Sequence, residues 1–200
     1  MKFTTRQLVT LAVFGALWGA VEISLGSLLK ALNLPLSGAI LAAVGLMIAM
    51  IGRLFVPRRG TTLFIGVIAM VLKIFSIGSI ILGPMIGILA EAILAEIVLS
   101  LFKKPSLPAF LLAGVAGSLW VVVQPFVTGL LLFGRDLFTV WLDLLDLGQR
   151  LFGIDTSAAV LIVLILAVVH VLIGMLGGWM AWTIGRSLLA RMPNMQSGSI

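Results

Sequence analysis

Long apolar runs, separated by short basic or turn-forming segments, dominate this chain. A run of about 20 mostly apolar residues crosses the ~30 Å hydrocarbon core of a bilayer as a helix. Six such runs can be marked, at about 8–32, 36–55, 61–82, 84–102, 107–133 and 156–188. Because 62% of the 200 residues are hydrophobic and only 10% are charged, no soluble domain can be separated from them. The pattern predicts an all-α, polytopic membrane protein with six transmembrane helices, a single transmembrane domain over residues 1–192 and a disordered tail at 193–200.

The basic residues give the expected orientation. Loops on the cytoplasmic side of membrane proteins carry an excess of Lys and Arg. Lys30, Arg135 and Arg150 fall on one side of the predicted spans, and nine basic residues fall on the other: Lys2, Arg6, Arg53, Arg58, Arg59, Lys103, Lys104, Arg186 and Arg191. We therefore expect a multi-pass protein of the plasma (inner) membrane with both termini cytoplasmic. The net charge of +6 arises from these loop clusters, so a nucleic-acid partner is not expected.

The N-terminal run is not followed by a small-residue cleavage pattern, so we expect it to be retained as the first transmembrane helix. Between the fifth and sixth spans, residues 135–153 alternate apolar and acidic side chains with a helical period, including Trp141, Asp143 and Asp146. This pattern predicts an amphipathic helix on the external surface. The helix is interpreted either as an anchored surface connection or as a lid over an external mouth.

Five polar side chains are predicted to lie at one depth in the membrane. Counting about 1.5 Å per residue from the span midpoints places them within roughly 3–6 Å of the midplane, towards the outside; they are Glu22, Lys73, Glu91, Gln124 and His170. Ionisable groups at this depth are costly and are candidates for a functional site. Glu96 lies five residues after Glu91, points about 140° away around the helix, and is expected to have a different role.

Two interpretations of these charges are open. In the first, Lys73 pairs with Glu91 or Glu22 only to fix helix packing, as buried ion pairs do elsewhere. In the second, the acids bind a ligand. One lysine does not compensate three acids, so at least one carboxylate is protonated, hydrogen-bonded or reserved for a ligand. The surplus of acids favours a cationic or amine-bearing ligand.

Two tryptophans each share a helical face with a polar residue. Trp18 precedes Glu22 by four residues, and Trp120 precedes Gln124 by four. An indole beside a hydrogen-bonding group suits a flat heteroaromatic ring, although a single transmembrane Trp more often packs against lipid or another helix. His170 is the only histidine and is either a packing residue, a ligand contact or a proton relay.

Several kinds of chemistry are not encoded. The chain has no cysteine and one histidine, so no metal site is expected. It contains no Walker A loop, zinc-protease helix or Gly-x-Ser-x-Gly elbow. We therefore expect no enzyme activity and no cofactor.

The first span carries small residues at a spacing of four, Ala12, Ala16 and Ala20. Such a stripe allows close approach of another helix, either within the protein or from a second membrane subunit. With six spans, cytoplasmic termini, this alanine stripe and the Gly83-Pro84 entry to a glutamate-bearing fourth span, the chain resembles the substrate-binding S-component of energy-coupling factor (ECF) transporters. That resemblance implies capture of a vitamin or precursor from outside, and docking of Ala12, Ala16 and Ala20 onto a transmembrane coupling subunit driven by ATPase subunits.

The expected function is therefore the solute-binding subunit of an ATP-driven micronutrient importer for a thiamine-like or aminopyrimidine-like compound. Trp18 and Trp120 would stack the ligand, Glu22 and Glu91 would accept hydrogen bonds from it, Gln124 would contact a ring edge, and Lys73 would set the charge of the acids or hold an anionic group, with His170 as a further candidate contact. Two alternatives are a self-sufficient proton-coupled carrier using Glu91, Glu96 and His170, and a non-catalytic assembly subunit of a membrane complex.

Overall fold

The computed structural model describes residues 3–76 and 82–192. In this part of the chain all the regular structure is helical. The elements are α1 (Thr5–Ala31), α2 (Ser37–Phe55), α3 (Thr61–Leu72), η1 (Lys73–Phe75), α4 (Leu82–Leu101), α5 (Leu107–Phe133), α6 (Leu137–Phe152), η2 (Thr156–Ala158) and α7 (Ala159–Ala190). The prediction of an all-α fold is confirmed.

Five helices in the described ranges are long and apolar enough to cross a membrane: α1, α2, α4, α5 and α7. They correspond to five of the six predicted spans, and the chain has the make-up of a multi-pass membrane protein. The predicted span at 61–82 differs. Helix α3 has 12 residues and continues only as the short 3₁₀-helix η1, after which Ser76 has an extended backbone. Residues 77–81, which the prediction included in this span, lie outside the described residues, as does the predicted tail at 193–200.

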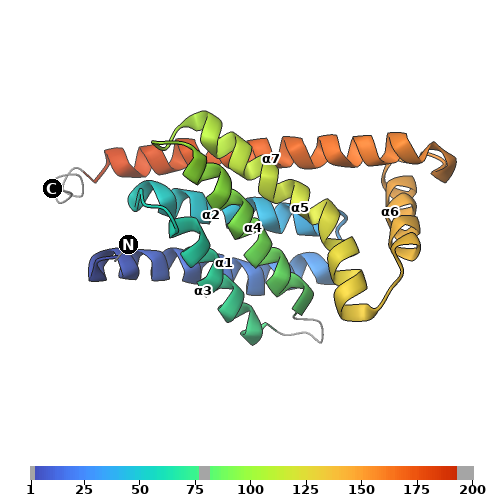
Figure 1. Ribbon diagram of the computed structural model, residues 1–200, viewed down its shortest axis with the longest axis horizontal. Helices are drawn as coiled ribbons and strands as arrows, with labels where there is room; N and C mark the ends of the chain where they lie inside the picture. The colour runs from blue at the N-terminus through green and yellow to red at the C-terminus, as the bar shows by residue number, and fades with distance from the viewer. Residues whose placement is uncertain (1–2, 77–81, 193–200) are drawn as a thin grey trace.

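Helix α2 lies at the centre of the bundle and contacts α1, α3, α4, α5 and α7. The main core forms around it from buried side chains of several helices, among them Trp18, Leu46, Ile65 and Phe110. Helices α1, α2, α3, α4, α5 and α7 run alternately in opposite directions, and Figure 1 shows the start of α1 and the end of α7 at the same end of the bundle. We call this the basic end, because Arg58, Lys103 and Arg191 follow or precede the helices there.

Helices α5 and α7 pack closely where they cross (Figure 1). Glycines at the crossing make this approach possible. A Cβ atom added at Gly174 would lie 2.5 Å from the carbonyl oxygen of Gly114 and 2.8 Å from the Cα of Val115. These neighbours are backbone atoms that do not yield to a side chain, so the small residues fix the distance between the two helices.

The amphipathic helix predicted at 135–153 is present as α6. It lies across the end of the bundle opposite the basic end, roughly crosswise to α7 (Figure 1). Its buried face packs Leu145 against Ile162 and Leu166 of α7, whereas Leu137 and Phe138 are exposed. The Asp136 carboxylate accepts a 2.8 Å hydrogen bond from the Thr139 N–H and caps the helix.

Candidate functional site

Three ionisable side chains from three helical elements are buried together between α1, α3 and α4. Lys73 begins η1, at the point where α3 ends, and its side chain reaches α1. Its Nζ donates to the backbone carbonyl of Glu22 at 2.8 Å and lies 3.1 Å from Glu22 Oε2. Glu22 and Lys73 are 5% and 7% exposed. Of the two partners considered from the sequence, Lys73 therefore pairs with Glu22.

Glu91 lies on α4 and is also 5% exposed. Its Oε2 atom is buried and has no hydrogen-bond partner among the described residues. The Glu22 carboxyl is near enough to act on Glu91 electrostatically, but no ion pair within 4.0 Å joins Glu91 to Lys73 in the described chain. The group thus holds two carboxyls and one ammonium, and a buried carboxyl oxygen without a donor costs free energy.

Gln124 of α5 lies beside the same face of α4. Its Nε2 donates to the Gly83 carbonyl at 3.0 Å. A Cβ atom at Gly87 would come within 2.6 Å of Gln124 Oε1, so the absence of a side chain at Gly87 makes room for the amide. Gly87 precedes Glu91 by one helical turn, which places both on one face of α4. The structure therefore brings Gln124 close to Glu91.

The two tryptophans differ in their surroundings. Trp18 is fully buried, and its indole fills the space that a side chain at Gly45 of α2 would occupy. Trp120 is only partly buried. The indole Nε1 of each is buried without a hydrogen-bond partner. Trp18 is thus a core side chain in this conformation, whereas Trp120 retains exposed ring surface and an unused donor.

His170 is 5% exposed, and its Nδ1 lies 2.7 Å from the Leu166 carbonyl oxygen on its own helix. A proton on Nδ1 would make this contact a hydrogen bond, which leaves Nε2 as an acceptor. Within the described ranges, no hydrogen bond or ion pair joins the ring to Glu22, Lys73 or Glu91. The shared depth predicted for five polar residues therefore yields one close group, from Glu22, Lys73 and Glu91, with Gln124 next to it.

Glu96, one turn and a half further along α4, belongs to a different cluster. Its carboxylate accepts hydrogen bonds from the backbone N–H of Gly60 at 2.6 Å and of Thr62 at 2.9 Å, and from Ser100 Oγ at 2.6 Å. Arg53 Nη1 lies 3.4 Å away as an ion-pair partner. Glu96 therefore caps the first turn of α3 from a neighbouring helix, so its environment differs from that of Glu91.

Ala12, Ala16 and Ala20 are all exposed along one side of α1. The internal contacts of this helix are made instead by the neighbouring glycines. A Cβ at Gly15 would lie 2.6 Å from Cβ of Ile68, and one at Gly19 would lie 2.8 Å from Cβ of Leu72. The glycines thus pack α1 on α3, and the alanine stripe faces away from the described chain.

Three polar residues were not singled out by the sequence analysis as parts of a site. Arg53 interrupts the apolar run of the second span. A single charge in such a run could have indicated that Arg53 pairs with a buried acid. Ser118 Oγ is fully buried without a hydrogen-bond partner, but a serine in an apolar helix gives no distinctive signal. The Arg186 side chain lies over Trp182, with 5.3 Å between the guanidinium carbon and the ring centroid; the four-residue spacing of the pair on one helix could have indicated this contact.

Among the described residues, no group of three His, Asp or Glu side chains is placed to hold a metal ion. Comparison with known proteins adds no assignment: no protein-family model, no curated protein and no solved structure matches this chain.

Proposed function

We propose that this protein is a membrane-embedded solute-binding subunit of a micronutrient importer, and that it takes a small amine-bearing or cationic compound with a heteroaromatic ring. The observation that carries the proposal is the Glu91 carboxyl. It is buried, its Oε2 has no donor among the described residues, and the Lys73 ammonium is bound to Glu22. A ligand N–H or cation would supply the missing donor and balance the second carboxyl.

Each neighbouring group has a defined part in this proposal. Glu91 accepts from the ligand amine, the Gln124 amide contacts an edge of the ring, and Trp120 offers a ring face and an N–H donor. Lys73 and Glu22 form a fixed pair that sets the local field. Trp18 is a core residue on the same face of α1 as Glu22 and packs one helical turn from this pair. A ligand could stack on Trp18 only if α1 moved away from α2. His170 remains a predicted contact.

The exposed alanine stripe supports a membrane partner. Ala12, Ala16 and Ala20 leave a shallow track on α1 into which a helix of another subunit fits closely. Since the chain has no nucleotide-binding motif, separate ATPase subunits would supply energy through a transmembrane coupling subunit, as the resemblance to ECF S-components implies. The basic end would face the cytoplasm and α6 would lie outside, in accord with the bias of Lys and Arg.

The two alternative functions make different demands. A proton relay through Glu91, Glu96 and His170 needs Glu96 to exchange protons, but that carboxylate already accepts three hydrogen bonds and pairs with Arg53. An assembly subunit would use Lys73 and Glu22 for packing alone and would bind no small molecule. The assembly subunit gives no role to the unpaired oxygen of Glu91, whereas the relay would use it as a proton acceptor.

A thermal-stability screen of the detergent-purified protein tests the proposal. Vitamins and precursors that carry an amine or a cationic ring should raise the melting temperature, by an amount that increases with concentration because the ligand binds only the folded state. Neutral isosteres of the same compounds are the controls. Equal shifts with both sets would contradict a carboxylate-based site, and the absence of any shift across the screen would favour the assembly subunit.

A further inference from the structure

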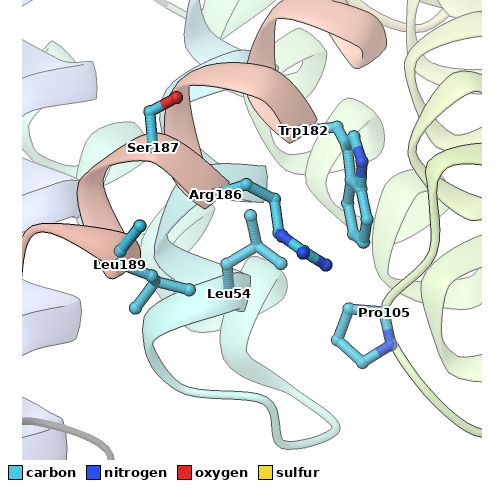
Figure 2. A pocket seen from close by; sticks show the side chains of 7 residues that line it. Leu54, Pro105, Trp182, Arg186, Ser187 and Leu189 are labelled. Atoms are coloured by element: carbon cyan, nitrogen blue, oxygen red, sulfur yellow. The ribbon is translucent and has the colours of Figure 1, made fainter. Parts of the chain in front are cut away.

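A groove opens at the basic end of the bundle, away from the three buried charges. Its volume is about 610 Å³, and its lining includes Leu54 at the end of α2, Pro105 before α5, and Trp182, Arg186 and Leu189 on the last turns of α7. Figure 2 shows the Arg186 side chain extending between Trp182 and Pro105, above Leu54. The groove therefore has an apolar floor and one cation reaching across it.

Arg186 is exposed, and its guanidinium lies 5.3 Å from the centroid of the Trp182 ring. No carboxylate of the described chain lies within 4.0 Å of it. Trp182 is held in turn by an edge contact with Phe110, at 5.3 Å between ring centroids. The indole thus fixes the position of a guanidinium that has no carboxylate partner in the part of the chain that the structure describes.

The rim of the groove is also positively charged. Lys103 and Lys104 directly precede Pro105, Arg191 directly follows Ala190, and all three side chains are exposed. The nearest acid of α4, Glu96, is buried and bound to Arg53, so it does not neutralise this surface. The charge of the groove complements an anion.

The position of the groove along α7 indicates which anion. Residues 159–184 carry no Lys, Arg, Asp or Glu, and at about 1.5 Å per residue this run is about 39 Å long. It exceeds the ~30 Å hydrocarbon core and ends within the headgroup layer, where Arg186 begins the charged segment. Trp179 and Leu188 are exposed beside the groove, as surfaces for acyl chains.

We propose that this groove binds an anionic phospholipid. Arg186 donates hydrogen bonds to the lipid phosphate, Lys103 and Lys104 add attraction from the rim, and the acyl chains lie along Trp179 and Leu188. Basic pockets between helices on the cytoplasmic side of membranes bind such headgroups, and each Lys or Arg near the surface contributes about fivefold in affinity. The inference is independent of the solute site around Glu91.

The test is a titration of the detergent-purified protein with phosphatidylglycerol, followed by native mass spectrometry, with phosphatidylcholine as the neutral comparison. Phosphatidylglycerol should bind more tightly to the wild type, and Arg186→Gln should weaken it about fivefold or more. Arg191→Gln is the matched control, since it removes a rim charge from the same helix end but outside the groove lining. It should weaken binding clearly less than Arg186→Gln does, because Arg191 adds only general attraction and no hydrogen bond to the phosphate. Arg186→Lys keeps the charge and should retain most of the preference, which guards against a folding defect in Arg186→Gln.

Four results would overturn the proposal. Equal binding of the two lipids would exclude recognition of the charge, and equal losses in Arg186→Gln and Arg191→Gln would assign the effect to diffuse surface charge. Full competition by inorganic phosphate would make the groove a site for free anions. Unchanged lipid binding in Arg186→Gln, together with loss of a co-purifying membrane protein, would assign the groove to a protein partner.

Discussion

Three glutamates in apolar helices have three different environments, and those environments separate structural from binding roles. Glu22 is paired with Lys73, Glu96 is saturated by backbone, hydroxyl and guanidinium groups, and Glu91 has an oxygen without a donor. Removal of a charge should therefore cost stability at the first two positions, because a buried partner loses its counter-charge. At Glu91, Oε2 has no hydrogen-bond partner among the described residues to lose.

The first prediction concerns Glu22→Gln. This change removes the counter-charge of the Lys73 ammonium, which is 7% exposed, and should lower the free energy of unfolding by about 3–5 kcal/mol. Denaturant unfolding in detergent measures the effect. Adding Lys73→Met should restore much of the lost stability, because the double variant no longer buries an unpaired charge. A single variant as stable as the wild type would show that the pair does not hold α1 on η1.

At the scale of the element, α3 and α6 show how short helices are fixed at their ends. Helix α3 begins against the Glu96 carboxylate of α4 and ends where Lys73 reaches Glu22. Helix α6 is capped by its own Asp136 and ends at Gly153, which adopts φ 66°, a conformation that suits glycine. The start of each helix is therefore held by one carboxylate, Glu96 for α3 and Asp136 for α6.

The second prediction concerns the pH dependence of the α6 cap. Hydrogen bonds from the side chain and the backbone N–H of Thr139 lower the pKa of Asp136 below its ordinary value of 3.8. Since the folded pKa is the lower one, the cap contributes its full stability above about pH 4 and loses it as the pH falls through the lowered pKa. The amide NMR shift of Thr139 should titrate with a midpoint below 3.8, and Asp136→Asn should abolish the titration. A midpoint at or above 3.8 would contradict the cap.

At the scale of the whole molecule, the sequence predicted the helical class, five of the long helices and α6, because apolar runs and helical periodicity are local properties. The predicted third span ran to residue 82, because hydropathy remains high beyond Phe75. Hydropathy does not reveal that α3 ends at Leu72, where the Lys73 side chain turns to contact Glu22. Depth counting selected the three charges that meet, but it also included His170, because depth says nothing about which face of a helix a side chain occupies. The pairing of Lys73 with Glu22 depends on how α1 and α3 cross on Gly15 and Gly19, which no local pattern encodes.

The third prediction concerns the alanine stripe. Ala16→Leu adds bulk to an exposed position of α1, so it should leave folding and solute binding unchanged. If a coupling subunit docks there, solute uptake should fall about tenfold or more, the effect of about 1.4 kcal/mol of lost packing. Uptake by cells that express the variant with its partners is the measurement, and Val168→Phe, at an exposed position of α7, is the control for added bulk. Full uptake by cells that express Ala16→Leu would show that the alanine stripe is not a docking surface.

The central claim is that the unpaired carboxyl of Glu91 receives the ligand, and Glu91→Gln tests it most directly. A ligand found in the screen is titrated against the wild type, Glu91→Gln and Asp143→Asn, a control that removes a carboxylate from exposed α6. Because Lys73 keeps its partner Glu22, Glu91→Gln should fold with a melting temperature near that of the wild type. Its affinity should fall by about 1.5–3 kcal/mol, the contribution of a hydrogen bond to a charged group, while Asp143→Asn binds normally. Unchanged affinity in Glu91→Gln, or a collapse in its melting temperature that Lys73→Met reverses, would contradict the account.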